Sequence, residues 1–404
     1  MKHAIAIAAG LAAGAAGATQ LTVIVEEVPD YDIVRALSAD FAQEHPGIEV
    51  VFEAMPFDAM RDRIITSALA PTATYDVIIV DNPWMEEFAR AGYLEPLRAR
   101  IEGTPGYDYD DFFTPLAAIG EVEGEIYGVP YYNYALGLIV RQDLIEAAGL
   151  AAPDSLAAFM ALARSLTTDD MRGIAMQPQR GYKIMEEWTN WLFASGGALF
   201  AEDGSVVVDS PEAVAALEAY IETHRAAAPA NSLNWGFDEA LRSVASGGSA
   251  MMLSYNWMLP TLNAPDGPAG DLAGSFRLHP VPGRKAVLGA WHWAIAANAA
   301  DKDAAWAFIS WLTAPDTDRA RVIAGGAPTR ESVTRDPDVW AQGFGEDYYA
   351  TVAEILATAQ PLATGVAAEE IIEIVGTELS EAVSGAKSPA DALADARRRV
   401  ERVR

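Results

Sequence analysis

Tryptophans recur beside carboxylates and amides, at the ends of short apolar runs or on a helix next to them. The residues that form this pattern are Asp81, Trp84, Trp188, Asn256, Trp257 and Trp291. An indole ring presents a flat apolar face and one N–H donor, whereas carboxylates and amides exchange hydrogen bonds with hydroxyl groups. The combination predicts a site for a hydroxyl-rich molecule such as a sugar or a polyol. Each ring taken alone is more typical of a hydrophobic core, and it is the recurrence that favours a binding site.

Motifs for covalent, nucleotide-dependent or metal-dependent chemistry are absent from the sequence. There is no cysteine, and the signatures GxGxxG, P-loop, HExxH, EF-hand and GxSxG do not occur. Of the five histidines, only His292 lies beside another candidate ligand residue, so a zinc site is not expected. A glycosidase needs two carboxylates flanking one bond, and no spacing among the 57 acidic residues singles out a pair. We therefore expect a binding protein and not an enzyme, with no cofactor and no metal ion.

Short apolar strands alternate with amphipathic helices in the first part of the chain. The predicted strands are 21–25, 48–52 and 75–80, and the predicted helices between them are 31–45 and 56–69. This rhythm predicts an α/β fold with a parallel sheet. Ligands of such sheets bind outside the carboxyl ends of the strands. Glu26 and Glu27, directly after the first strand, are therefore candidate ligand groups, with a solvated turn as the alternative.

The segment 125–138 is the first place where the chain is expected to cross between two lobes. Gly128 and Pro130 interrupt it, so it is not one regular element. Polar and aromatic residues then crowd together without the alternation of a half-buried strand, at Tyr132, Asn133 and Tyr134. They would line a cleft, or else belong to a buried strand whose tyrosines pack in a core. Second and third crossings are predicted at 287–296 and 325–330.

Length and charge limit the kind of protein and its partners. With 404 residues, two domains or two interleaved lobes are expected. The net charge of −29 argues against nucleic acid or an anionic membrane as a partner, because both repel an acidic surface.

Residues 1–18 have the composition of a signal peptide. Lys2 supplies the positive start, an Ala-rich apolar stretch follows, and Ala16-Gly17-Ala18 fits a cleavage site before Thr19. Without a cysteine there can be no lipid-modified N-terminal Cys, and no later apolar run is long enough to span a membrane. We expect an exported protein, free and soluble in the periplasm without a lipid anchor.

The order and spacing of seven stretches resemble those of the extracellular solute-binding proteins of ABC importers, the group that includes the maltose-binding protein and other sugar and polyol binders. These stretches include DNPW at 81–84, SYNW at 254–257 and GGAPTR, and in full they are 76–97, 125–150, 188–200, 247–257, 301–315, 325–330 and 384–400. The resemblance implies a two-lobe periplasmic binding protein fold with interleaved lobes joined by about three crossing segments. It also implies a monomer that closes on its ligand and presents both lobes to an inner-membrane ABC permease in a transient contact.

The resemblance sets the expected lobes and ligand contacts. Lobe 1 is expected to comprise 19–131 and 291–328, and lobe 2 to comprise 132–290 and 329–404, with the ligand cleft between them. Ligand positions of the family fall near Glu26, Glu27, Trp84, Tyr132, Asn133, Tyr134, Trp188, Trp257, Trp291 and Arg330. Many relatives place a carboxylate where this chain has Tyr132-Asn133-Tyr134, which argues against a maltose-type contact set and favours a smaller neutral ligand.

Two other classes of function remain open at this point. One is a secreted enzyme that acts on carbohydrates, which would convert a sugar where a receptor returns it unchanged. The other is a receptor for a charged solute such as a sugar phosphate. The positive charge would come from Arg180, Lys183, His292 and Arg330, although surface or interlobe pairing is the more ordinary role for such groups.

Overall fold

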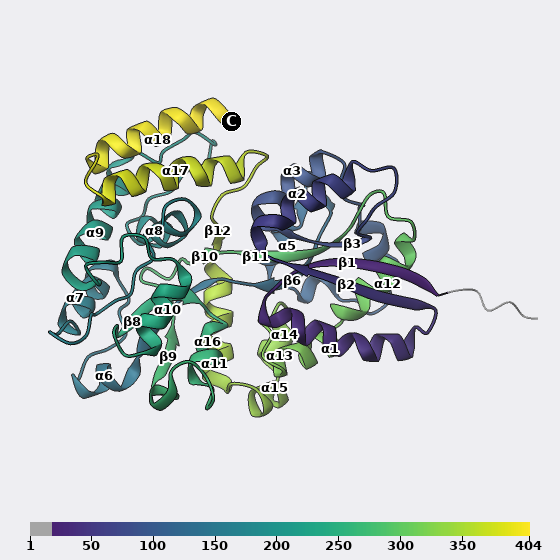
Figure 1. Cartoon of the computed structure of the whole chain (residues 1–404), viewed down its shortest axis with the longest axis horizontal. Coiled ribbons are helices and arrows are strands. Elements are labelled where there is room, and N and C mark those ends of the chain that lie inside the picture. The colour runs from purple at the N-terminus through teal and green to yellow at the C-terminus, as the bar shows by residue number, and fades with distance from the viewer. Residues whose placement is uncertain (1–17) are drawn as a thin grey trace, which may run out of the picture.

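The computed structural model describes residues 18–404, which form two α/β lobes joined by a narrow middle region (Figure 1). The predicted signal peptide therefore lies, except for Ala18, outside the described residues. Within residues 18–404 no helix is both long enough and apolar enough to cross a membrane. The mixed α/β fold with two interleaved lobes confirms the expectation from the sequence.

The larger sheet has five strands in the order β2-β1-β3-β11-β6. Its strands are β1 (Thr19–Glu26), β2 (Ile48–Met55), β3 (Val77–Asp81), β6 (Val129–Asn133) and β11 (Ala290–Ile295). β1 pairs in parallel with β2 and β3, whereas β11 runs antiparallel to both β3 and β6. Every residue of β3 is buried, because helices cover both faces of the sheet and leave an apolar run as the stable sequence for a central strand.

In the part of the chain that the structure describes, nine helices belong to the half of the molecule that contains this sheet. They are α1 (Pro29–Glu44), α2 (Phe57–Ala68), α3 (Met85–Arg90), α4 (Arg98–Glu102), α5 (Thr114–Ile119), α12 (Lys302–Leu312), α13 (Pro315–Ile323), α14 (Glu331–Thr334) and α15 (Pro337–Gln342). Four minor elements complete this half of the molecule: the 3₁₀ turns η1 (Asn82–Trp84) and η2 (Tyr109–Asp111), and the two-residue strands β4 (Glu121–Val122) and β5 (Glu125–Ile126).

The second lobe has a small antiparallel sheet in the order β8-β7-β9 and a larger helical layer. Its strands are β7 (Leu136–Arg141), β8 (Met251–Tyr255) and β9 (Phe276–His279). Its helices are α6 (Gln142–Ala147), α7 (Leu156–Ser165), α8 (Tyr182–Ala194), α9 (Pro211–Ala227), α10 (Phe237–Ala245), α11 (Met258–Asn263), α16 (Glu346–Thr358), α17 (Ala368–Val383) and α18 (Pro389–Val403), with the 3₁₀ turn η3 at Gly270–Leu272. Helix α8 packs against both α9 and α17 and is buried along most of its length.

The chain passes between the lobes at two places where one strand directly follows another that belongs to a different sheet. β6 belongs to the larger sheet and β7 to the smaller one, so the chain crosses at Tyr134-Ala135. The return crossing is at Gly289, between β10 (Val287–Leu288) and β11, and β10 pairs in parallel with β12 (Gln360–Pro361). A Cβ at Gly289 would overlap the ring of Tyr134, so only glycine allows the two crossings to lie against each other.

The third crossing differs from the expectation at 325–330. That segment stays against the larger-sheet lobe: the N–H of Phe113 donates to Thr329 O at 3.1 Å, and Phe112 forms a β-bridge with Arg330. Helix α16, by contrast, contacts α5 on one side and β9 on the other. We therefore propose that the third crossing lies at α16 and β12, later in the chain than residue 328. We likewise propose the first two boundaries at Tyr134-Ala135 and Gly289, a few residues from the expected 131/132 and 290/291, because β6 and β11 both belong to the larger sheet.

Candidate ligand-binding cleft

A cavity of about 630 Å³ lies between the two lobes. Lobe 1 contributes the carboxyl ends of β1 and β3, together with parts of β6 and β11. Lobe 2 contributes the start of α8, the start of α10 and the end of β8. Because the lining comes from both lobes, a molecule bound here contacts both at once.

The wall from lobe 1 is made of carboxylates held by tyrosines. The Tyr132 hydroxyl donates to Glu26 Oε2 at 3.0 Å, and the Tyr134 hydroxyl donates to Asp81 Oδ1 at 2.5 Å. Burial raises the pKa of Asp81 well above its usual range and also raises that of Glu26. Among the described residues no hydrogen bond reaches the other oxygen of either carboxylate, Asp81 Oδ2 or Glu26 Oε1. This wall therefore offers acceptors for ligand hydroxyls.

The wall from lobe 2 is made of stacked aromatic rings. Tyr255 packs against Phe237 and Trp257, with ring centroids 5.3 and 5.5 Å away and interplanar angles of 24° and 23°, and the Phe237 and Trp257 centroids are 6.2 Å apart, so the three rings form one cluster. Such a plate suits the weakly apolar C–H face of a sugar or polyol.

Lys183 is the cation of this wall, and its charge is balanced. The Lys183 ammonium lies 4.7 Å from the Tyr255 ring centroid and donates to Glu186 Oε2 at 3.0 Å and to the Tyr255 hydroxyl. Burial alone would lower the pKa of Lys183, but Glu186 and Tyr255 together outweigh it and the pKa is raised. Lys183 is therefore a charged donor that already has a counter-ion.

Trp84 and Trp291 meet on the lobe 1 side, but only Trp291 lines the cavity. Trp84 is 1% exposed, stacks on Phe57 at 5.3 Å and meets Trp291 edge to face at 5.4 Å. Its indole N–H donates to Glu369 Oε2 of α17 at 3.0 Å. The structure thus corrects the expected role of Trp84: it supports the rings that face the cavity and links lobe 1 to lobe 2.

Asn133 and Asn256 also lie away from the cavity, in the middle region where the chain crosses. Asn256 Nδ2 donates to Asn133 Oδ1 at 2.5 Å, and Asn133 Nδ2 donates to the carbonyl of Pro328 at 2.7 Å. The N–H of Asn256 donates to the carbonyl of Ala135 at 3.0 Å. Both amides are fully buried, so they hold the crossing segments together instead of meeting a ligand.

Three further predicted residues are buried outside the cavity. Trp188 is enclosed in the core of lobe 2, on α8. His292 Nε2 is 2.8 Å from the carbonyl of Leu116, and burial lowers the pKa of His292 to about 4. Arg330 is held by backbone carbonyls, with Nε 2.9 Å from Thr313 O. Neighbours on a strand point to opposite faces, which explains why Trp291 reaches the cavity and His292 does not.

Glu27 and Arg180 are exposed and do not line the cavity. The predicted residues that the structure brings together there are Glu26, Asp81, Tyr132, Tyr134, Trp257 and Trp291. The sequence prediction missed Phe57, Tyr182, Phe237 and Tyr255 as lining residues, and considered Lys183 only as a source of positive charge. Tyr255 precedes Asn256 and Trp257 directly, so the strand-end pattern could have included it.

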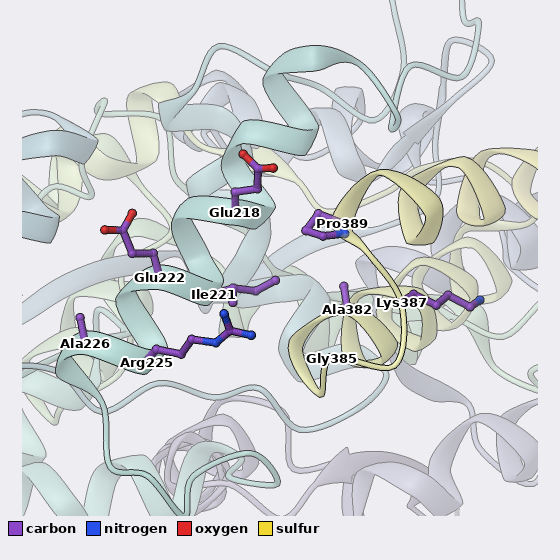
Figure 2. A pocket seen from close by; sticks show the side chains of 9 residues that line it. All are labelled: Glu218, Ile221, Glu222, Arg225, Ala226, Ala382, Gly385, Lys387 and Pro389. Carbon is purple, nitrogen blue, oxygen red and sulfur yellow. The ribbon is translucent and has the colours of Figure 1, made fainter.

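Another hollow, of about 450 Å³, lies between α9 and the loop that joins α17 to α18, and Figure 2 shows its side chains. It is lined by lobe 2 alone, with charges of both signs from Glu218, Glu222, Arg225 and Lys387. A ligand there could not couple to movement of the lobes. Within residues 18–404 no group of three or more His, Asp or Glu side chains is arranged to hold a metal ion.

Two α/β lobes around a cleft with a carboxylate wall and an aromatic wall define the class of two-lobed solute receptors. Residues 26–318 match the family model described as bacterial extracellular solute-binding protein, and the chain belongs to this family. The resemblance inferred from the order of the sequence stretches is thereby confirmed.

Individual relatives agree with this assignment. A probable amino-acid ABC transporter periplasmic-binding protein of Sinorhizobium fredii is 25% identical over 376 residues, covering 92% of this chain and 86% of that protein. A mannitol-binding protein of Pseudomonas aeruginosa is 26% identical over 308 residues, covering 74% and 70%. The crystal structure of an ABC transporter solute-binding protein from Agrobacterium radiobacter K84, in complex with ribitol, superposes with a TM-score of 0.85 at 24% identity over 96% of this chain and 99% of that one. At that identity the superposition establishes a shared fold.

Proposed function

We propose that this protein is a periplasmic receptor that captures a neutral sugar or polyol by lobe closure and delivers it to the permease of an inner-membrane ABC transporter. The observation that carries the proposal is the pairing of unlike walls across one cavity: carboxylates from lobe 1 and a stacked aromatic plate from lobe 2. A relative that binds mannitol and a fold neighbour crystallised with ribitol support this ligand class.

Closure follows from contact with both walls. Ligand hydroxyls would donate to Asp81 and Glu26, and the carbon face of the ligand would lie on Trp257 and Tyr255. A ligand that touches both lobes binds the closed state more tightly than the open state and so shifts the population toward closure. Such a mechanism makes and breaks no covalent bond, and in the proposed role the protein has no catalytic activity.

The charge of the cleft favours a neutral ligand over a sugar phosphate. Lys183, the cation that lines the cavity, is paired with Glu186, whereas Glu26 and Asp81 bring carboxylates into the same space. A phosphate would have to displace Glu186 and approach two carboxylates, which costs electrostatic free energy. The same argument disfavours a free amino acid, whose carboxylate would need an unpaired cation.

A thermal-shift screen against sugars, polyols, sugar phosphates and amino acids tests the proposal, because a ligand that binds only the folded state raises the melting temperature. We expect a shift with one or more neutral hydroxylated compounds, accompanied by a change in tryptophan fluorescence. A shift with sugar phosphates or amino acids alone would contradict it. Recovery of the bound compound unchanged after incubation separates a receptor from an enzyme.

The cellular parts of the proposal have their own tests. We propose an exported protein without a lipid anchor, monomeric, in transient contact with its permease. N-terminal sequencing of protein from a periplasmic extract should give a chain that starts near Thr19, and light scattering should give the mass of one chain. Recovery with the membrane fraction, or with an intact N-terminus, would contradict the proposed location.

A further inference from the structure

A second interlobe chamber, of about 350 Å³, adjoins the main cavity. The two spaces share Val28, Tyr132 and Trp257 as lining residues, so they lie next to each other at these residues. The chamber extends between the start of α1 and the end of α13 on lobe 1, and α11 on lobe 2.

The chemistry of the second chamber differs from that of the main cavity. Its remaining lining is largely apolar, with Ile33, Pro260, Ala264, Ala327 and Phe344 among its residues. Its polar side chains are those of Asp30 and Thr261. The Asp30 carboxylate already accepts from Arg321 Nη1 at 2.7 Å.

A second sugar ring would fit this chamber poorly. Hydroxyl groups that lose water without gaining hydrogen bonds destabilise the bound state. The chamber offers few partners for such a ring, because Asp30 Oδ2 is engaged by Arg321, Asp30 Oδ1 is buried, and most of the other lining side chains are apolar. An apolar group, in contrast, gains free energy by leaving water for this lining.

We propose that the preferred ligand carries an apolar substituent, an aryl or short alkyl group, which lies in the second chamber while its hydroxyl groups occupy the main cavity. This inference rests on the proposed function and narrows its ligand class to sugars or polyols with an apolar appendage. Both lobes line the chamber, with Ala324 on one side and Pro260 on the other. The substituent therefore adds contacts with both lobes and favours closure further.

Pairs of compounds that differ only in the substituent test the inference. Isothermal titration would compare glucose with phenyl β-D-glucoside, galactose with phenyl β-D-galactoside, and each further parent sugar that gives a thermal shift with its phenyl glycoside. In at least one pair we expect the phenyl member to bind about tenfold more tightly, as expected for burying part of one ring. If sugars or polyols bind and no phenyl glycoside binds more tightly than its parent, the inference is wrong and the receptor function stands. If no sugar, polyol or phenyl glycoside binds, the proposed function itself fails.

A variant that fills the second chamber tests whether the tighter binding of the phenyl glycoside comes from that chamber. Ala324 is exposed at the rim of the chamber, so Ala324→Trp should be tolerated by the fold and should place an indole in the space for the substituent. We expect it to abolish the tenfold advantage of the phenyl glycoside over its parent sugar, when the affinities for both are measured with the variant. Ala226→Trp, on the rim of the hollow between α9 and the α17–α18 loop (Figure 2), is the matched control and should change neither. A phenyl advantage that survives in folded Ala324→Trp would place the substituent elsewhere and overturn the inference.

Discussion

Two strand ends in this molecule share a sequence pattern and use it in opposite ways. After β3, the last strand residue Asp81 lines the cavity and Trp84 is buried behind it. After β8, Tyr255 and Trp257 line the cavity, and it is the amide of Asn256 that is buried. After β3 the carboxylate faces the cleft and the tryptophan is buried, whereas after β8 the aromatic rings face the cleft and the amide is buried.

The local backbone explains this difference. Asp81 Oδ1 accepts from the N–H of Asn82 at 2.9 Å and caps the 3₁₀ turn η1, which folds Trp84 back toward Phe57 and Phe88. After β8 the chain enters α11 at once, with Trp257 as the N-terminal cap residue, so its ring stays beside the cleft. A tryptophan next to a strand end is therefore a ligand contact or a support depending on the turn that follows.

The largest effects are expected from replacing Trp257 and Trp84, and the two substitutions should affect different properties. Trp257→Ala should weaken ligand binding by about 100-fold or more, because it removes an aromatic anchor of the lobe 2 wall, and should change the melting temperature little. Trp84→Ala should lower the free energy of unfolding by about 3–5 kcal/mol, as truncation of a fully buried tryptophan does. Isothermal titration and chemical denaturation measure the two effects.

Trp311→Ala is the control for this pair, since Trp311 is partly buried on α12 away from the cleft. It should leave the affinity unchanged. If Trp257→Ala binds like the wild type, or if Trp84→Ala is as stable as the wild type, the contrast between the two strand ends is wrong.

The next largest effect is expected from removing the buried side-chain amide of Asn256, which follows β8. Asn256→Ala leaves Asn133 Oδ1 with only the N–H of Ala135 as a donor, at 3.3 Å, and should lower the free energy of unfolding by about 1–3 kcal/mol, with a smaller change in affinity than Trp257→Ala. A double-mutant cycle with Asn133→Ala should show a coupling energy well above zero. Additive effects of the two substitutions would mean that the amide pair does not hold the crossing segments.

Much of the fold of lobe 1 follows from its sequence, for a physical reason. Buried parallel strands need apolar runs, and the runs at 21–25, 48–52 and 75–80 predicted β1, β2 and β3 with errors of at most three residues at an end. The first crossing was also predictable, because glycine, proline and clustered tyrosines interrupt the strand pattern there. The second lies within the segment 287–296, which was predicted from an apolar run that carries Trp291, His292 and Trp293.

The direction of single side chains was not predictable in the same way, because it depends on partners far along the chain. Trp188 is buried because α17, which begins at Ala368, covers α8. The Arg330 guanidinium donates to the carbonyls of Tyr107 and Asp108, more than 200 positions earlier in the chain. The sequence shows a cation near other candidate residues but not these distant acceptors, so Arg330 was predicted as a ligand contact. No local pattern encodes such contacts.

A smaller effect is expected at the contact between Trp84 and α17. Glu369→Ala removes the acceptor that joins lobe 2 to the Trp84 indole across 3.0 Å, so the closed state should lose about 1 kcal/mol and the ligand should dissociate about fivefold faster. Stopped-flow tryptophan fluorescence measures the rate. Glu370→Ala, at an exposed neighbour on the same helix, is the matched control and should dissociate at the wild-type rate. Equal rates in both variants would show that Trp84 supports lobe 1 only.

The smallest expected effect is the pH dependence of affinity, and it tests the carboxylate wall against the aromatic wall. Burial raises the pKa of Asp81 and Glu26, so both carboxyls take up protons at higher pH than exposed ones do. Ligand hydroxyls that donate to the ionised oxygens stabilise the ionised form, so the affinity should rise with pH through these pKa values and fall on acidification. We expect about a threefold loss between pH 8 and pH 5 by titration calorimetry, since ligand contacts with the aromatic wall do not titrate. Asp81→Asn should bind more weakly at pH 8 and show a flatter profile, because one of the two titrating acceptors is gone. An affinity that increases on acidification would mean that the carboxyls act as donors, and that the acceptors belong to the ligand and not to the protein.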